Sequence, residues 1–126
     1  MTTAGQVSYP ELTRSISARL VSLRDGQPGV MHGFRTMSES ALEAGVIPAR
    51  TKELMALALG IAAHCDACIG FHAKALVDMG ATRVEIEETI ALAVYMGGGP
   101  SLMYGANALA AYEQFVAKAA THHAAA

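Results

Sequence analysis

The sequence predicts an all-α fold: a single-domain helical bundle of about six helices. Apolar residues recur at the three- and four-residue spacing of an amphipathic helix. No segment keeps the apolar–polar alternation of a strand for long, and β-branched residues are scattered. Short stretches with glycine or proline separate the apolar segments, so neighbouring helices should pack closely. The helices are expected at 10–23, 30–43, 48 to between 60 and 64, 65–79, 83–96 and 101–118.

Proline and glycine place the helix boundaries in the first two thirds of the chain. Pro10 suits a first helical turn, and the dipeptides Asp25-Gly26 and Pro28-Gly29 interrupt the pattern that follows it. Pro48 opens the third helix. Met79-Gly80 ends the fourth, because glycine is the usual residue just past a helix.

The fifth helix has the clearest start signal. Thr82 and Glu85 fit a capping box, in which each side chain accepts from a backbone N–H at the helix end. That helix ends at the Gly-Gly-Gly-Pro run of 97–100, and Ser101 can cap the last helix. The glycine run lacks the lysine of a phosphate-binding loop and follows no strand. We therefore favour a tight turn or a close helix contact there.

Composition limits the class of protein. The formal net charge is -2 and no basic cluster stands out, which argues against nucleic-acid binding. Charged residues are 16% of the chain, against about 25% in a typical soluble domain. A small monomer needs more charge than this to cover its surface. We therefore expect part of the surface to be buried in a homo-oligomer.

The chain shows no membrane or export signal. No apolar run approaches the roughly 20 residues of a membrane span. The first residues lack the basic and then apolar order of a secretory signal. The expected compartment is the cytoplasm, where a Cys-x-x-Cys motif is more often catalytic or metal-binding than a structural staple. We expect disordered tails at 1–8 and 121–126 on either side of a helical domain at 9–120.

The main candidate for chemistry is HCDACIGFH at 64–72, with two cysteines and two histidines. Cys65, Cys68 and His72 lie three and four residues apart, so they form one stripe on a helix. Such a spacing brings two cysteines within the Cα separation that a disulfide accepts. A structural zinc ion needs about four surrounding ligands, and no second cysteine pair supplies them. A metal shared between subunits and a buried helix with inert cysteines are the alternatives.

A redox dithiol has its own physical support. A helix that starts at Cys65 places both thiols near its positive end, which favours the thiolate. His72, one turn beyond Cys68, could relay a proton, and a carboxylate would orient it. Asp66 is close in sequence but points to another face. Glu53, in the preceding helix, would have to fold back onto His72. From the spacing alone it could equally be a solvated first-turn glutamate.

The combined pattern resembles the alkylhydroperoxidase AhpD branch of the carboxymuconolactone decarboxylase family. Its elements are Glu53, eleven intervening residues, Cys65-Asp66-Ala67-Cys68, three more residues and His72. The surrounding sequence is similar to the family core over 50–109. This resemblance implies an AhpD-like all-helical fold, homo-oligomers (trimers or hexamers) and dithiol peroxidase chemistry. We expect no cofactor and no metal.

The resemblance also implies roles for the site residues. Cys68 is the peroxidatic thiol, which attacks the peroxide and becomes a sulfenic acid, and Cys65 resolves it as a disulfide. Glu53 and His72 form the proton relay. A dithiol or a lipoylated protein would then reduce the disulfide. The implied activity is that of a thiol-dependent alkyl hydroperoxidase or disulfide oxidoreductase in antioxidant defence.

One position departs from the family pattern. The best-known AhpD enzymes carry a histidine just before the second cysteine, and this chain has Ala67 there. Peroxidase turnover is then expected to be weak or directed at another oxidant. His64 could compensate, although we favour a solvent-facing place for it at the start of the helix. The other function classes are a non-enzymatic oligomeric protein that senses redox state or packs its cysteines, and, less favoured, a carboxymuconolactone decarboxylase.

Overall fold

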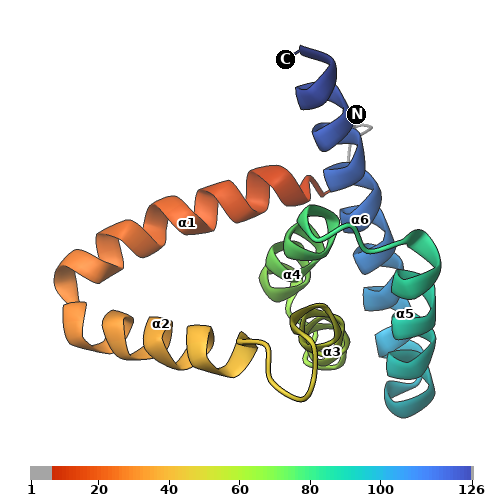
Figure 1. Ribbon diagram of the computed structural model, residues 1–126, viewed down its shortest axis with the longest axis horizontal. Helices are drawn as coiled ribbons and strands as arrows, with labels where there is room; N and C mark the ends of the chain where they lie inside the picture. The colour runs from red at the N-terminus through yellow and green to blue at the C-terminus, as the bar shows by residue number, and fades with distance from the viewer. Residues whose placement is uncertain (1–6, 126) are drawn as a thin grey trace.

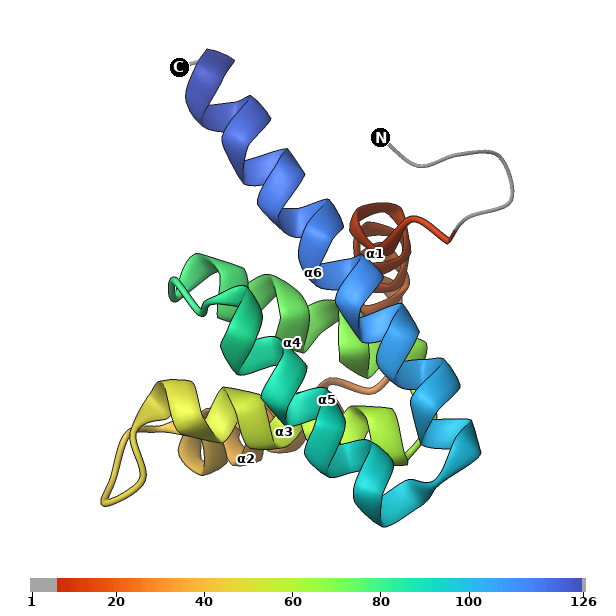
Figure 2. The ribbon, with the colours of Figure 1, turned by 90° about the vertical axis from the view of Figure 1, so that its right-hand side faces the viewer.

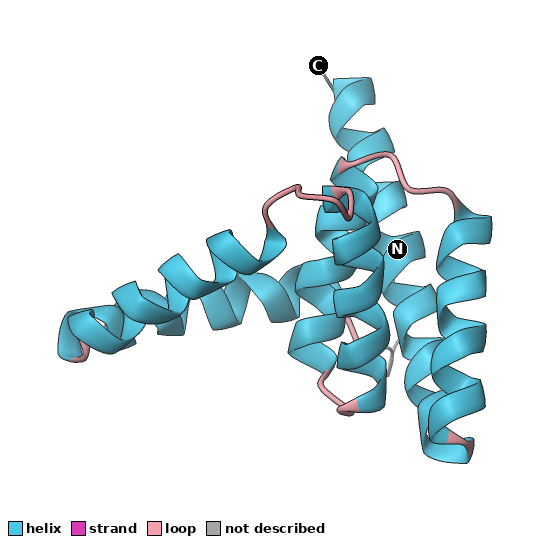
Figure 3. Ribbon diagram, turned by 60° about the horizontal axis from the view of Figure 1, so that its bottom comes forward, coloured by secondary structure: helices cyan, strands magenta, loops and turns pink. Residues whose placement is uncertain are grey.

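The computed structural model describes residues 7–125, and within that range it consists of six α-helices with no strand (Figures 1 and 3). The predicted all-α class is therefore confirmed. None of the described helices is both long and apolar enough to cross a membrane. In chain order the helices are α1 (Tyr9–Gly26), α2 (Pro28–Leu42), α3 (Ala49–Ala62), α4 (Asp66–Asp78), α5 (Arg83–Gly97) and α6 (Gly99–Ala125).

The core lies between α3, α4, α5 and α6, and α1 joins it through its first turns (Figure 2). Each large apolar side chain removed from water there contributes about 1.5–3 kcal/mol before the entropy of ordering is counted. Glycine brings two pairs of helices close together: a Cβ on Gly70 would press on Thr13, and one on Gly105 would press on Ile90. The largest fully buried apolar side chains are Tyr9, Leu57, Ile61, Ile69, Leu76 and Ile86.

Helices α1 and α2 form a hairpin that projects away from the other four helices (Figure 1). No residue of α2 is buried. Lys52 on α3 ties down the end of α2, because its Nζ donates to the carbonyl oxygens of Ala41 at 3.1 Å and Glu43 at 2.7 Å. The hairpin leaves large apolar side chains in contact with solvent, namely Leu20, Val21, Leu23, Val30, Phe34 and Met37.

All six expected helices are present, with differences at their ends. Ser8 caps α1 by accepting from the Glu11 N–H, so the helix starts one residue earlier than expected and runs on through Asp25-Gly26. α2 starts at Pro28, whose missing N–H costs nothing in a first turn. The expected tail at 1–8 lies outside the described residues except for Val7 and Ser8.

The last helix differs most from the sequence-based expectation. It begins at Gly99, so Ser101 lies inside it and is buried, and the prediction that Ser101 caps it is wrong. It continues beyond Lys118 to Ala125, through most of the stretch expected as a tail. The alanine-rich end of the chain explains this continuation, because alanine has the highest helix propensity of all residues.

The glycine run and the capping box behave as predicted. Gly98 takes a φ of 73°, which suits glycine, and a Cβ on Gly97 would collide with the Ser101 side chain. Thr82 and Glu85 form the reciprocal capping box. The backbone N–H of Thr82, and then the Arg50 guanidinium, lower the pKa of Glu85. The Arg50–Glu85 ion pair also links α3 to α5.

Candidate active site

The turn between α3 and α4 sets the position of the two cysteines. The chain leaves α3 at Ala62 and reverses through His64, which takes a left-handed φ of 56°. Cys65 is the N-cap of α4, and its Sγ accepts from the Cys68 N–H at 3.2 Å. The helix therefore starts one residue after the predicted Cys65. Both sulfurs lie at its positive end, where a thiolate is favoured in the reduced protein.

A disulfide joins Cys65 and Cys68, whose Cα atoms lie 5.2 Å apart. Cys68 is exposed, whereas Cys65 is half-buried. Cys68 is therefore the more solvent-accessible residue of the pair. Gly60 on α3, which the sequence analysis did not single out, lets α4 begin this close: a Cβ there would lie 3.2 Å from the Cys68 Cβ.

Glu53 and His72 come together between α3 and α4. His72 Nδ1 lies 2.6 Å from Glu53 Oε2. Glu53 is only 7% exposed, so it is not a solvated first-turn glutamate. An ionised carboxylate can only accept, so the Nδ1 proton of His72 points to Glu53. The Nε2 atom is left to exchange protons with another group, and the His72 side chain is 27% exposed, which gives it access to solvent.

The remaining polar residues of the motif face other elements. Asp66 points away from the cysteine–histidine stripe, as expected, and accepts from Tyr9 on α1 and Asn107 on α6. His64 is exposed, and its ring stacks on Tyr104 of α6 with centroids 4.8 Å apart and planes 6° from parallel. This contact directs the His64 ring toward α6. Ala67 contributes no polar group to the site.

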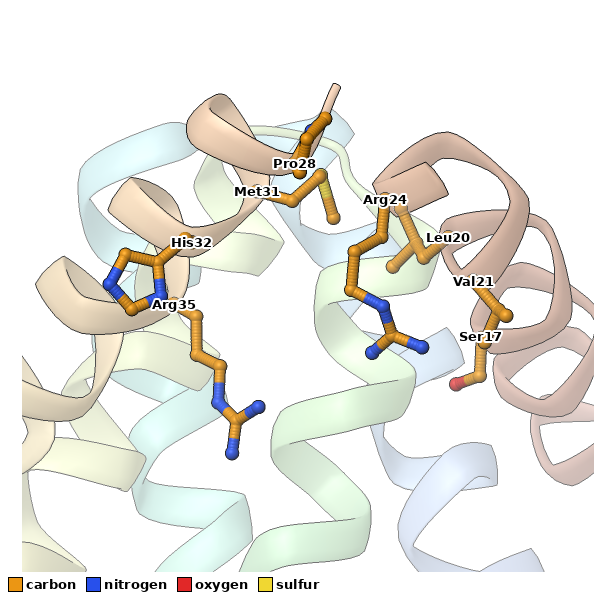
Figure 4. Close-up of a pocket in the computed structure, with 8 residues that line it drawn as sticks. All are labelled: Ser17, Leu20, Val21, Arg24, Pro28, Met31, His32 and Arg35. Carbon is orange, nitrogen blue, oxygen red and sulfur yellow. The ribbon is translucent and has the colours of Figure 1, made fainter. Parts of the chain in front are cut away.

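Outside this motif, the features of interest are possible metal clusters and grooves. Across the described residues, no three or more His, Cys, Asp or Glu side chains gather where they could hold a metal ion. A groove of about 470 Å³ lies between α1 and α2, distant in sequence from the cysteines. Arg24 and Arg35 reach into the space between these helices, beside the apolar side chains of Leu20, Val21 and Met31 (Figure 4).

The fold and the site together define a class: an all-α protein with a dithiol at a helix start and a carboxylate–histidine pair one turn away. Such a set of side chains can exchange electrons through the sulfurs and protons through the imidazole. The chain belongs to the carboxymuconolactone decarboxylase family, whose model matches residues 28–111. The predicted family is thereby confirmed. This family includes both decarboxylases and AhpD peroxidases, so membership alone does not choose between the two reactions.

Individual relatives are similar to this chain over most of its length. An uncharacterised protein from Cupriavidus necator is 36% identical over 113 residues, covering 90% of this chain and 96% of that protein. The crystal structure of an apo family member from Legionella pneumophila is 46% identical, with a TM-score of 0.84 and coverage of 86% and 96% of the two chains. A family member from Thermotoga maritima, 24% identical with a TM-score of 0.74 over 81% and 87%, shows the same fold.

Proposed function

We propose that this protein is a thiol-dependent peroxidase or disulfide oxidoreductase that uses Cys68 and Cys65. The observation that carries the proposal is the Cys65–Cys68 disulfide with the Glu53–His72 pair beside it. Burying a carboxylate costs free energy unless the carboxylate is paired and hydrogen-bonded. Here Glu53 is paired with His72, which lies on the same stripe of α4 as the cysteines, as expected for a functional site. The Thermotoga protein has a suggested involvement in an antioxidative response, but its likeness concerns the fold, so the proposal rests on the residues.

The proposed reaction begins at Cys68, the more exposed residue of the pair. The Cys68 thiolate attacks the terminal oxygen of a hydroperoxide, the O–O bond breaks, and the alkoxide leaves as an alcohol after taking a proton. His72 can deliver that proton, with Glu53 orienting its ring. The Cys65 thiolate then attacks the Cys68 sulfenic acid, and water leaves as the disulfide forms. One hydroperoxide thus oxidises two thiols and yields one alcohol and one water.

A dithiol or a lipoylated protein would close the cycle by two thiol–disulfide exchanges, in which its own thiols become a disulfide. We place the protein in the cytoplasm, where such reductants keep dithiols reduced. Because Ala67 removes one member of the AhpD proton relay, we expect slower turnover than in that branch, or a preference for another oxidant.

Stopped-flow oxidation of the reduced protein tests the proposal. Hydrogen peroxide and an organic hydroperoxide are each mixed with wild type, Cys68→Ser and Cys65→Ser, and thiols are counted afterwards. We expect one equivalent of peroxide to remove two thiols in wild type. Cys65→Ser should stop at a sulfenic acid, and Cys68→Ser should lose the fast reaction. If Cys68→Ser consumes peroxide as wild type does, the assignment is wrong.

The redox-sensor alternative differs in turnover. A sensor oxidises once and is not recycled rapidly, so it predicts no sustained peroxide consumption with dithiothreitol or dihydrolipoamide present. An inert, core-packing pair predicts slow and unselective thiol reaction even in the first turnover. Sustained consumption that depends on both cysteines separates the enzyme from both alternatives.

We also propose that the protein works as a homo-oligomer, a trimer or a hexamer. The α1–α2 hairpin buries no residue of α2, and a helix gains most of its stability in proteins from packing an apolar face. A second uncovered apolar surface lies over α3 and α5, with Met55, Leu59, Leu92, Tyr95 and Met96 exposed. Light scattering at micromolar concentration is expected to give a multiple of the chain mass, and a monomer mass would overturn this proposal.

A further inference from the structure

A second polar cluster connects the start of α4, between the two cysteines, to α1 and α6. Asp66 is the first residue of α4 and lies between the two cysteines in sequence. Its Oδ1 accepts from the Tyr9 hydroxyl at 2.6 Å and from Asn107 Nδ2 at 3.2 Å. One carboxylate oxygen therefore connects the start of α4 to α1 and to α6. We call Tyr9, Asp66 and Asn107 the Asp66 cluster.

The donors of this cluster are themselves firmly placed. Tyr9 is 1% exposed, and its backbone N–H donates to Gln114 Oε1 at 2.8 Å. Thr13 Oγ1 donates to the Tyr9 carbonyl at 2.9 Å. Gly70, one turn along α4, leaves room for Thr13 and the Tyr9 ring. Burial, and then the hydrogen bond to Asp66, raise the pKa of Tyr9, so its hydroxyl stays a donor throughout the physiological range.

The charge of Asp66 acts on the same helix end as the thiols. The partial positive charge of that end favours a thiolate at Cys65 or Cys68. A carboxylate in the first turn repels a thiolate and so opposes its formation. Two hydrogen-bond donors on the carboxylate oxygen partly neutralise its charge and weaken this repulsion. The negative charge of Asp66 therefore raises the free energy of the reduced, thiolate form, and the hydrogen bonds from its donors reduce this increase. It leaves the uncharged disulfide form almost unaffected.

We propose that the charge of Asp66, held by Tyr9 and Asn107, sets the reduction equilibrium of the Cys65–Cys68 pair. This inference rests on the proposed redox function of the dithiol. It adds a control from the α1 and α6 side to the Glu53–His72 relay on the α3 side. Titratable groups on and around α4 also include Glu53, which pairs with His72, and Tyr104, on which His64 stacks.

The test measures the equilibrium of the disulfide with dithiothreitol near pH 9, above the ordinary thiol pKa of about 8.5, so that thiolates are present. Asp66→Asn removes the charge and keeps the shape, so we expect a shift of about fivefold toward the reduced protein. Tyr9→Phe removes only the hydroxyl that donates to Asp66, so the carboxylate keeps more of its negative charge and repels a thiolate more strongly. We expect it to shift the equilibrium about twofold or more toward the disulfide. A tenfold shift corresponds to about 30 mV.

The opposite signs distinguish charge control from simple loosening. If the cluster only braced the turn, both variants would weaken the disulfide and both would shift toward the reduced form. Asp78→Asn is the matched control, because it removes the same charge at the far, exposed end of α4. Its equilibrium constant with dithiothreitol should stay within twofold of the wild-type value. Shifts of the same sign, or no shift in either variant, overturn the inference.

Folding of the variants does not decide the outcome. If Asp66→Asn does not fold, Tyr9→Phe and Asn107→Leu decide by their sign: a shift toward the disulfide supports the inference, and any other result overturns it. A wild-type disulfide that does not exchange with dithiothreitol overturns the redox function and this inference together. Normal exchange with unshifted variants overturns only the role of Asp66. Normal exchange without peroxide consumption overturns the peroxidase reaction and leaves the role of Asp66 intact.

Discussion

Replacing Glu53 with glutamine removes the charge from the Glu53–His72 pair and nearly preserves its shape. The Nδ1–Oε2 separation is 2.6 Å, and Glu53 is 7% exposed. A hydrogen bond to a charged group contributes about 1.5–3 kcal/mol and a neutral one about 0.5–1.5 kcal/mol. The difference of about 1–2 kcal/mol corresponds to a loss of about 5- to 30-fold in rate. If the new amide donates to Nδ1, His72 also adopts the wrong tautomer and the loss is larger.

The assay is stopped-flow oxidation of the reduced Glu53→Gln protein by an organic hydroperoxide. Glu88→Gln is the matched control, because it makes the same chemical change at an exposed position on α5. We expect the control to react within twofold of wild type and Glu53→Gln to react about tenfold or more slowly. Equal rates for Glu53→Gln and wild type, with both folded, would refute the relay. An equal loss in the control would refute its specificity.

Three further predictions concern stability and are checked by thermal or denaturant unfolding. Gly70→Ala should cost about 1–3 kcal/mol, because its Cβ would lie 2.8 Å from Thr13 Cγ2, whereas Gly33→Ala in open space on α2 should not destabilise. His64→Gly should be about 1 kcal/mol more stable than His64→Ala, because only glycine adopts the left-handed φ without strain. Glu85, whose pKa is lowered, stabilises the fold fully above the ordinary glutamate value of about 4.3. That contribution is lost as the pH falls through its lower folded pKa, so wild type and Glu85→Gln should converge in acid. The glycine argument is contradicted if Gly70→Ala proves more stable than Gly33→Ala, and the His64 argument if His64→Ala proves more stable than His64→Gly. The Glu85 argument is contradicted if the stability difference between wild type and Glu85→Gln widens in acid.

Features that depend on local order along the chain were predictable from the sequence. The capping box of Thr82 and Glu85 and the turn at 97–100 are contained within a few residues, so their signals are complete in the sequence. The ends of α6 were not predicted correctly. Ser101 was a good cap by type, but its packing inside the helix beside Gly97 excluded that role. Expecting the last helix to end at about Lys118 gave too little weight to the alanines that extend it to Ala125.

The candidate site was also only partly predictable from the sequence. The sequence alone determined that Cys65, Cys68 and His72 share one stripe, because residues three and four apart meet on any α-helix. Resemblance to a family suggested Glu53, but spacing could not place its side chain. Only the packing of α3 against α4 brought it within 2.6 Å of His72.

Tertiary structure also decided what Asp66 contacts. Its partners Tyr9 and Asn107 lie 57 and 41 residues away, on helices at opposite ends of the chain. Periodicity specifies which face of a helix is apolar, but it does not specify which helix covers that face or at what height. Those choices depend on how all the helices pack at once, including close approaches such as that at Gly70. The sequence thus determined the helices and the dithiol stripe, and the packing decided which carboxylate contacts His72 and which donors hold Asp66.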